Sequence, residues 1–232
     1  MLELADIHTH YGTSHILQGV SLTVQKGKCV ALLGRNGAGK STTIHTIAGL
    51  NKPSKGTIKF TTHSIGNQSP HKISRLGVGL VPQGRRIFPS LTIRENLTMA
   101  ARNHSGEDGW NIEKVYDLFP VLKERELNMG TELSGGQQQM LAIGRALMTN
   151  PTFLLMDEPS EGLAPVIIDQ VGEIVKQIKQ TGLSILMVEQ NIALACQCAD
   201  EILVMNKGVI VWKGTPDDLM SNESIQHKYL GV

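Results

Sequence analysis

The sequence contains few cysteines, and their arrangement excludes a disulfide framework. Only Cys29, Cys196 and Cys198 are present among 232 residues, and so sparse and odd-numbered a set is typical of proteins kept in a reducing compartment. Cys196 and Cys198 lie close together, but no second pair of ligands follows at a zinc-site spacing. The sequence therefore favours ordinary packing over a metal centre for these thiols.

The chain has no excess of either charge. Lys and Arg number 22 against 21 Asp and Glu, which gives a formal net charge of +1, whereas proteins that bind the phosphate backbone broadly show a basic surplus. Aromatic residues make up only 4%, which leaves few rings for stacking on bases. We therefore expect no nucleic-acid partner, although a small nucleotide needs only a local phosphate site.

Long apolar runs and targeting signals are also missing. No segment reaches the ~20 apolar residues of a membrane-spanning helix. The first residues carry early acids instead of a basic region followed by an apolar one. We therefore expect no signal peptide, and we expect any membrane association to depend on a partner.

The pattern of apolar residues predicts an α/β fold. The sequence is 41% apolar, which is enough for a sizeable core, and alternating strands and helices favour a largely parallel sheet. Short β-like runs fill residues 1–26, with a turn at 11–14. Further strands are expected at residues 29–33, 56–60, 77–82, 153–156 and 184–188, followed by a hairpin over 202–205 and 209–212.

One stretch differs from the rest of this pattern. Residues 91–130 have helical periodicity interrupted by polar breaks at 103–109 and 128–131. We interpret them as a helical lobe inserted into a core formed by residues 1–90 and 131–232. A helix expected from about residue 137 follows the lobe and continues to about 149. The whole chain, residues 1–232, is expected to be one domain.

A glycine-rich segment between a predicted strand and a predicted helix carries the strongest chemical signal. It fits the pattern Gly-x-x-x-x-Gly-Lys-Ser and consists of Gly34, Arg35, Asn36, Gly37, Ala38, Gly39, Lys40 and Ser41. Such glycines let backbone amides close around phosphate oxygens, and the next helix presents its positive end. Lys40 would neutralise the β- and γ-phosphates, Ser41 would ligate Mg²⁺, and Thr42 would extend the cradle. The alternative is a structural glycine-rich turn.

Two acids follow a buried apolar run later in the chain. Residues 153–156 are all apolar and precede Asp157 and Glu158, which suits a strand whose carboxyl end meets a ligand crevice. Asp157 would hold Mg²⁺, and Glu158 would polarise the attacking water beside the γ-phosphate. The alternative is a strand that ends in a solvated acidic turn, which the upstream phosphate loop makes less favourable.

A second glycine-rich helix start precedes this strand. Ser134 is placed to cap the helix, while Gly135 and Gly136 expose its first amides and Gln137 follows them. The chain would then have two helix ends that bind phosphate. The alternative is a plain capped helix after a turn.

These three motifs, in this order, resemble those of ATP-binding cassette (ABC) ATPases, and the resemblance covers essentially the whole chain. It implies a P-loop NTPase core with a mostly parallel sheet, an N-terminal antiparallel β subdomain and an inserted helical subdomain. It also implies that ATP and Mg²⁺ bind, and that two subunits, identical or different, pair head to tail. Residues 134–137 would then face the γ-phosphate held by the partner subunit.

The resemblance assigns roles to three further residues. Tyr11, in an early turn, would stack on adenine, and Gln83 would contact Mg²⁺ and the water and connect to the helical lobe. The simpler alternatives are a turn tyrosine and a polar loop residue. Gln190 occupies the position where the family usually has a histidine that contacts the γ-phosphate. Because its amide never carries a charge, we expect no pH-sensitive switch there. We interpret the histidines as surface or packing residues.

A second departure from the family pattern lies after Glu158. The family's loop ends in an aspartate before proline, but here Ala164 precedes Pro165, which puts coupling through that carboxylate in doubt. The chain resembles an ATPase subunit of bacterial branched-chain amino acid importers in both departures and in residues 81–97, 138–148 and 159–165. Relatives that serve urea and short-chain amides share most of these motifs, so the solute stays open.

This resemblance implies partners and a location. They are a second ATPase subunit, membrane permease subunits and, indirectly, a solute-binding protein, on the cytoplasmic face of a bacterial membrane. A soluble ABC ATPase of DNA repair or translation is a second hypothesis, but the chain lacks the long coiled coils, tandem cassettes or basic surfaces typical of that class. A non-enzymatic nucleotide sensor is a third, and the intact Lys40, Asp157 and Glu158 argue against it.

Overall fold

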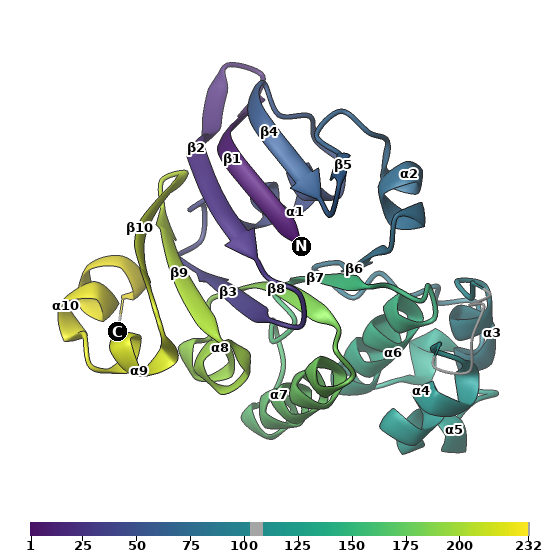
Figure 1. The fold of residues 1–232 in the computed structure, drawn as a ribbon. Helices are drawn as coiled ribbons and strands as arrows, with labels where there is room; N and C mark the ends of the chain where they lie inside the picture. The colour runs from purple at the N-terminus through teal and green to yellow at the C-terminus, as the bar shows by residue number, and fades with distance from the viewer. Residues whose placement is uncertain (103–108, 232) are drawn as a thin grey trace.

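The structure, a computed structural model, describes residues 1–102 and 109–231. Two β-sheets lie one above the other, and helix α1 (Lys40–Ile47) lies between them (Figure 1). Ile44 and Ile47 of α1 belong to one buried cluster with apolar side chains of both sheets. The core therefore runs through the space between the sheets and fixes their separation.

The upper sheet is antiparallel and four-stranded, in the order β2-β1-β4-β5. Its strands are β1 (Leu2–Tyr11), β2 (Ser14–Val24), β4 (Lys55–Phe60) and β5 (His63–Ser64). Leu2 and Leu4 of β1 are buried and Glu3 is exposed, the alternation of a sheet with one covered face. The turn expected at residues 11–14 joins β1 to β2, with Tyr11 opposite Ser14.

The lower sheet is six-stranded, in the order β10-β9-β3-β8-β7-β6. Its strands are β3 (Cys29–Leu33), β6 (Val78–Val81), β7 (Phe153–Asp157), β8 (Ser184–Glu189), β9 (Glu201–Asn206) and β10 (Val209–Gly214). Neighbouring strands are parallel except β10, which pairs antiparallel with β9. Every residue of β3, β7 and β8 is buried, as expected for strands covered on both faces. The mostly parallel core sheet and the antiparallel N-terminal sheet of the sequence prediction are confirmed.

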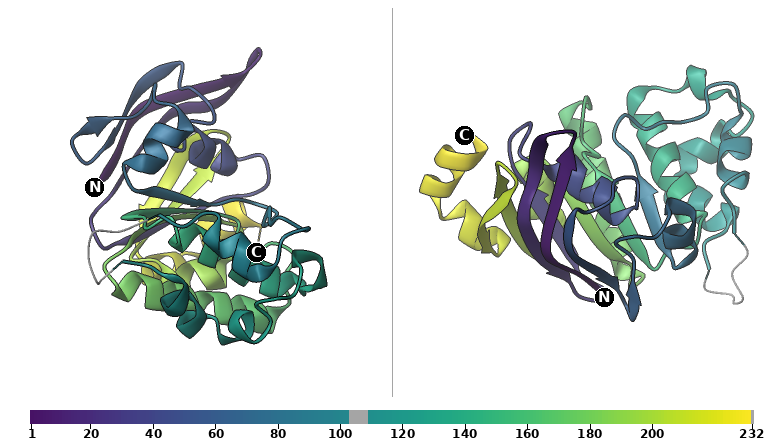
Figure 2. Two further views of the ribbon diagram at one scale, coloured as in Figure 1. Left: turned by 90° about the vertical axis from the view of Figure 1, so that its right-hand side faces the viewer. Right: turned by 90° about the horizontal axis from the view of Figure 1, so that it is seen from above.

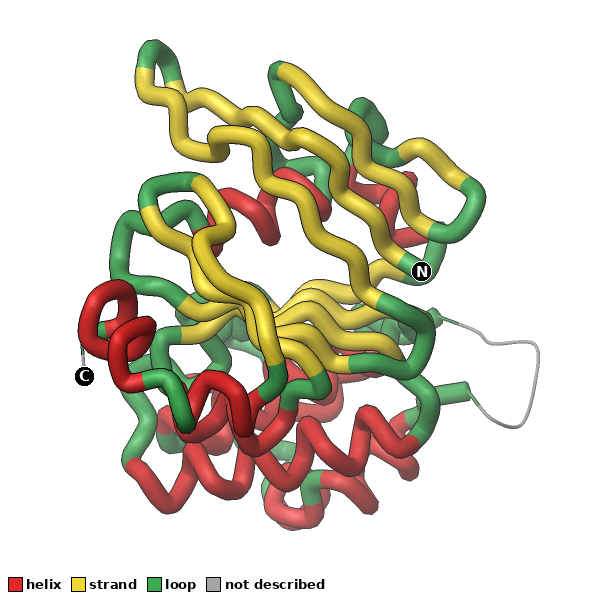
Figure 3. The backbone as a smooth tube through the Cα atoms, turned by 60° about the vertical axis from the view of Figure 1, so that its left-hand side comes forward, coloured by secondary structure: helices red, strands yellow, loops and turns green. Residues whose placement is uncertain are grey.

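Helices cover the lower face of this sheet, opposite the antiparallel sheet (Figure 3). They include α6 (Gly135–Leu147), α7 (Pro165–Gln180) and α8 (Ile192–Cys198). Cys29, Ala31 and Leu33 of β3 pack into the buried cluster on this face, whereas Val30 and Leu32 belong to the cluster on the other face. Among the described residues, no helix is both long and apolar enough to cross a membrane.

Three short helices form a lobe at one end of the molecule (Figures 1 and 2). They are α3 (Ile93–Thr98), α4 (Ile112–Leu118) and α5 (Pro120–Glu124), followed by the 3₁₀ turn η1 (Gly130–Glu132). Residues 103–108 of the expected polar break lie outside the described residues. The helix expected from about residue 137 begins at Gly135, because Ser134 caps it with a hydrogen bond from the Gln137 amide.

The remaining helices lie at the edges of the two sheets. Helix α2 (Pro70–Arg75) lies beside β6, and α9 (Pro216–Met220), α10 (Glu223–Ile225) and the π turn η2 (Gln226–Leu230) lie at the end opposite the helical lobe (Figure 2). For residues 216–230 the sequence predicts no element. Their turns are short and capped locally, for example by Thr215 at the start of α9, so they lack a long apolar period.

Candidate active site

The glycine-rich loop connects buried strand β3 to α1. Gly34 approaches β9, the neighbour of β3 in the sheet, so closely that a Cβ on Gly34 would lie 2.5 Å from the carbonyl oxygen of Met205. Gly39 has a φ of 111°, which side chains rarely allow. No side chain of the described residues caps the first turn of α1, so its amide groups stay available to an anion.

Lys40 extends from α1 back over this loop. Its side chain is buried, and Nζ donates to the carbonyl oxygens of Gly34 at 2.9 Å and Arg35 at 3.3 Å. The same nitrogen lies 3.0 Å from Oε1 of Glu158. Ala38 and Thr42 are buried nearby. The loop therefore fixes a desolvated cation where phosphate oxygens would gather.

Asp157 ends strand β7 beside Ser41. Ser41 Oγ donates to Oδ1 of Asp157 at 2.9 Å, while Oδ2 is buried and accepts no hydrogen bond. Burial raises the pKa of this carboxyl above its ordinary value, and the hydrogen bond from Ser41 offsets only part of the rise. A buried oxygen without a hydrogen bond is costly, so Ser41 and Asp157 together fit a hard cation such as Mg²⁺.

The donor set around Asp157 is small. Within the described ranges, no group of three or more His, Cys, Asp or Glu residues is arranged to hold a metal ion. Magnesium sites in nucleotide-binding proteins use one or two carboxylates and complete the shell with water and phosphate oxygens. Asp157 and Ser41 suit a metal that binds together with a nucleotide.

Glu158 follows Asp157 in a left-handed backbone conformation with a φ of 48°. Its amide donates to the carbonyl oxygen of Val188 at 3.0 Å, which ties the end of β7 to β8. Its carboxylate is 3.0 Å from Lys40 Nζ and accepts a hydrogen bond from Gln190 Nε2 at 3.2 Å and a long one from Gln83 Nε2 at 3.4 Å. One carboxylate thus contacts nitrogen groups from three separate segments.

The two glutamines connect this carboxylate to its surroundings. Gln190 Nε2 also donates to Oδ1 of Asn36 in the phosphate loop at 2.6 Å. Gln83 Nε2 also donates to Oε1 of Glu161 at 3.2 Å. Because both amides are neutral, they orient Glu158 without adding charge.

An open cavity of about 320 Å³ lies between the phosphate loop and the β1–β2 turn. Tyr11, about half exposed, lines one side, and its hydroxyl is hydrogen-bonded to Asn51 Nδ2. The cavity is lined by Tyr11, Ile16, Asn36, Gly37, Gly39, Lys40, Ser41, Thr42, Gln83 and Glu158. The fold therefore gathers half of the residues selected from the sequence, nine of eighteen, around a single cavity.

The second glycine-rich helix start is not part of this cavity. None of residues 134–137 lines it. Ser134 and Gln137 form a capping box, in which each side chain accepts a hydrogen bond from the other residue's amide. At Gly136 a Cβ would lie 2.8 Å from Ile167 Cγ2, so glycine is required by a close approach to α7.

Three residues at the site were not singled out from the sequence. His45 Nε2 lies 3.7 Å from Oδ2 of Asp157, and the signal for it was its position one helical turn after Ser41. Glu161 accepts from Gln83. Glu189 is buried beside Gln190, and no sequence pattern distinguishes it from the end of an apolar strand.

Known proteins resemble this chain over most or all of its length. Residues 17–161 match the protein family described as "ABC transporter". The chain is 42% identical, over 100% of both chains, to the high-affinity branched-chain amino acid transport ATP-binding protein BraG of Pseudomonas aeruginosa. It is 32% identical, over 100% of this chain and 99% of the other, to a probable branched-chain amino acid transport ATP-binding protein, LivF, of Archaeoglobus fulgidus.

The chain also resembles ABC proteins whose names give another transport role or no solute. The chain is 31% identical to the lipopolysaccharide export system ATP-binding protein LptB of Escherichia coli, over 95% of this chain and 93% of the other. A solved nucleotide-free ATP-binding cassette from an ABC transporter has a TM-score of 0.84 and 29% identity, and covers 97% of this chain and 96% of its own. The chain therefore belongs to the ABC transporter family, as an ATP-binding subunit that hydrolyses ATP to drive transport.

Proposed function

We propose that this chain powers the import of branched-chain amino acids. The hydrolytic part of the proposal rests on one observation: Glu158 is held between Lys40, Gln83 and Gln190 beside the phosphate loop. The solute and the direction rest on the full-length similarity to BraG. Import of urea or short-chain amides is the alternative for the solute, and the similarity to LptB keeps export as the alternative for the direction.

The residues divide the work of hydrolysis. Lys40 and the amides of the glycine-rich loop hold the β- and γ-phosphates, and Tyr11 supports adenine. Ser41, Gln83 and Asp157 hold Mg²⁺, which when bound offsets the negative charge of the phosphates. Glu158 accepts the proton of the attacking water. Gln190 and Gln83 fix the direction of the Glu158 carboxylate, and Gln190 donates to the γ-phosphate.

We propose that the complete site needs a second ATPase subunit. Residues 134–137 do not line the cavity of their own chain, although they start a helix of 13 residues. The positive end of such a helix favours an anion. In a head-to-tail pair, identical or different, this end would meet the γ-phosphate of the partner and bury ATP between the subunits.

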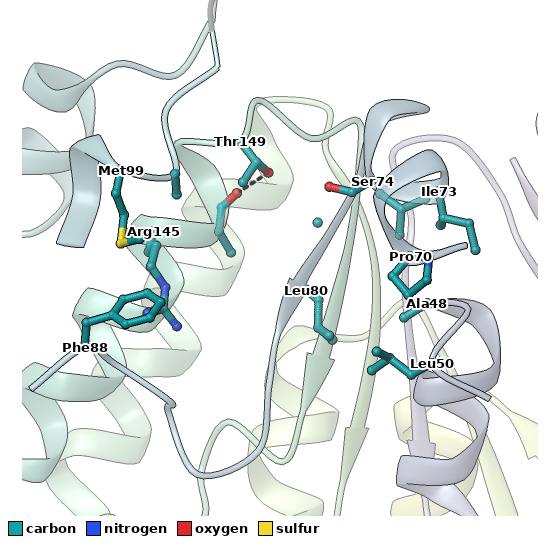
Figure 4. Close-up of a pocket in the computed structure, with 14 residues that line it drawn as sticks. Ala48, Leu50, Pro70, Ile73, Ser74, Leu80, Phe88, Met99, Arg145 and Thr149 are labelled. Carbon is teal, nitrogen blue, oxygen red and sulfur yellow. Dashed lines mark hydrogen bonds between the residues drawn. The ribbon is translucent and has the colours of Figure 1, made fainter. Parts of the chain in front are cut away.

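We also propose that a permease docks in an apolar groove of about 400 Å³ (Figure 4). Leu50, Phe88 and Met99 line it and are exposed. Arg145, at the Phe88 side, has one guanidinium nitrogen, Nη1, that is buried without a hydrogen-bond partner. This combination suits an amphipathic permease helix whose carboxylate or last carbonyl groups face Arg145. Docking there would hold the chain on the inner face of the membrane.

The groove connects two parts of the proposed domain organisation. Leu50 follows α1 in the core of residues 1–90 and 131–232, whereas Met99 follows α3 in the proposed helical subdomain of residues 91–130. A permease helix in the groove would touch both parts. ATP binding that draws two subunits together would then move the permease between its access states.

The test is to purify the chain with its permease and measure ATPase stimulation by the binding protein with leucine, valine, urea or acetamide. Stimulation by leucine and valine supports the proposal. If only urea or acetamide stimulates the ATPase, the proposed solute is wrong and the alternative solute takes its place. If transport of the stimulating solute in proteoliposomes runs away from the ATP side, import is wrong.

A further inference from the structure

We propose that Glu189 is a positioning residue for hydrolysis, because its carboxylate joins the loop after Glu158 to the turn that carries Gln190. This inference rests on the proposed roles of Glu158 and Gln190. Glu189 is the last residue of β8 and is only 1% exposed. Its hydrogen bonds reach Ser160, Gln190 and Asn191 and not the phosphate loop, so it would act through its neighbours.

Four donors from two segments converge on this carboxylate. Oε1 accepts the Ser160 amide at 2.9 Å. Oε2 accepts the Ser160 hydroxyl at 2.8 Å, the Gln190 amide at 2.9 Å and the Asn191 amide at 3.1 Å. Ser160 lies two residues after Glu158, and Gln190 and Asn191 follow Glu189 directly. One side chain therefore fixes both segments that approach the reacting atoms.

The charge of Glu189 is balanced by hydrogen bonds alone. Within the described part of the chain, no lysine or arginine forms an ion pair with it. Burial raises the pKa of Glu189 above its ordinary value, and the amides of Asn191 and Ser160 offset only part of this rise. A carboxylate that accepts several backbone N–H groups is well suited to the interior, and four donors reach this one, three of them at Oε2.

The geometric consequence falls on the contact between Glu158 and Gln190. The Glu158 amide is already tied to the Val188 carbonyl, and Glu189 adds a second tie further along both segments. Between these two ties, Gln190 Nε2 lies 3.2 Å from Glu158 Oε2. Without the second tie, the loop and the turn would separate, and the base would lose its fixed direction toward the water.

Substituting glutamine for Glu189 tests this tie with little change of shape. Whichever way the new amide is turned, its NH₂ group faces an N–H donor, so Ser160 or Gln190 loses its acceptor. We expect kcat to fall by about 10- to 100-fold, the range that a small misplacement of reacting groups produces. KM for ATP and the amount of ATP bound per chain should stay within about twofold of wild type, because Glu189 does not contact Lys40 or the loop amides that would hold the phosphates.

Two further variants separate positioning from general stability. Ser160→Ala should lower kcat by itself, and combined with Glu189→Gln it should lower kcat little beyond Glu189→Gln alone, because both remove the same tie. Glu201→Gln is the matched control: Glu201 is also a strand glutamate, on β9, but its partner is Lys213 at 2.8 Å, away from the cavity. Its kcat should equal that of wild type.

The measurements are steady-state ATPase kinetics and ATP binding, on the chain in complex with its permease. The inference is overturned if Glu189→Gln keeps wild-type kcat, if its ATP binding falls in parallel with kcat, or if the two substitutions act additively. Glu158→Gln is measured alongside. If Glu158→Gln keeps full turnover, the proposed function itself fails; if only Glu189→Gln does, the positioning role alone fails.

Discussion

Glu158 shows how one residue combines contributions from distant parts of the chain. Its neighbours come from the phosphate loop, from the segment after β6 and from the turn after β8. Two of the three contacts are neutral amides. The carboxylate is therefore oriented mainly by hydrogen bonds, and only Lys40 adds a full opposite charge.

Replacing the neutral Gln190 by histidine should introduce a pH dependence that the wild type lacks. An imidazole titrates near pH 6.5, and its cation beside Glu158 would weaken this residue as a base. We expect kcat of Gln190→His to show an added ionisation and to fall severalfold as the pH drops from about 8 to about 6.

The control for this prediction is the same substitution at Gln170, which is exposed on α7. Gln170→His should follow the wild-type pH profile. Superimposable profiles for Gln190→His and wild type would show that residue 190 does not act on the charge at Glu158.

How far the sequence predicts this site depends on how local each signal is. Lys40, Ser41 and the loop glycines follow from a contiguous pattern with a chemical reason for each position. Asp157 and Glu158 follow from the end of an apolar run. Glu189 could not be predicted, because its four donors become neighbours only when the loop at Ser160 packs against the end of β8.

Helix α6 is the element that links the lobe to the core. Its first turn carries residues 134–137, and further along it Gly144 allows the lobe helices to approach. A Cβ at Gly144 would lie 2.9 Å from Cγ1 of Val115 on α4 and 3.1 Å from Cδ2 of Leu97 on α3. The close approach of the lobe to α6 thus depends on residue 144 being a glycine.

Gly144→Val should therefore destabilise the fold. Overpacking of a buried contact costs about 1–3 kcal/mol, and we expect a loss of this size in the free energy of unfolding, measured with urea. Gln170→Val on the exposed face of α7 is the control, since it tests valine in a helix without a clash. Equal stability of the two variants would mean that the lobe does not pack against α6 at Gly144.

The sequence predicts these elements better than their ends. The expected helix at about residue 137 starts two residues earlier, because the capping box of Ser134 and Gln137 includes both glycines in the first turn. The lobe was expected as a helical region, but its separate helices α3, α4 and α5 are too short for a strong periodic signal. Asn111 caps α4 and Pro120 begins α5, so local residues set these limits.

In the whole molecule, the cavity proposed for the nucleotide and the groove proposed for the permease lie at different places. The cavity proposed to bind ATP lies between the phosphate loop and the antiparallel sheet, whereas the apolar groove lies between α2, β6 and α6 (Figure 4). Arg145 connects the groove to the segment after Gln83, because Nη2 donates to the carbonyl oxygens of Arg85 and Arg86 at 3.3 and 2.7 Å. A permease that moves Arg145 in the groove would therefore also move the segment that carries Gln83.

Leu50→Asp should separate docking from hydrolysis. Leu50 is 54% exposed at the groove, so the fold should tolerate the change, but an aspartate buried against a permease would lack a partner. We expect about tenfold or greater loss of permease affinity with unchanged basal ATPase activity, measured by co-purification and by phosphate release. Leu127→Asp, at a leucine that is 77% exposed and outside the groove, should bind normally. Equal binding by both variants would place the permease elsewhere.

Glu158 is proposed to activate the water in a site that a second ATPase subunit completes. The most direct measurement is steady-state ATP turnover of Glu158→Gln compared with wild type, together with ATP binding and the size of the ATP-bound species. We predict that kcat falls by about 100-fold or more, while ATP still binds and holds two ATPase subunits together. Turnover at the wild-type rate would show that Glu158 does not activate the water.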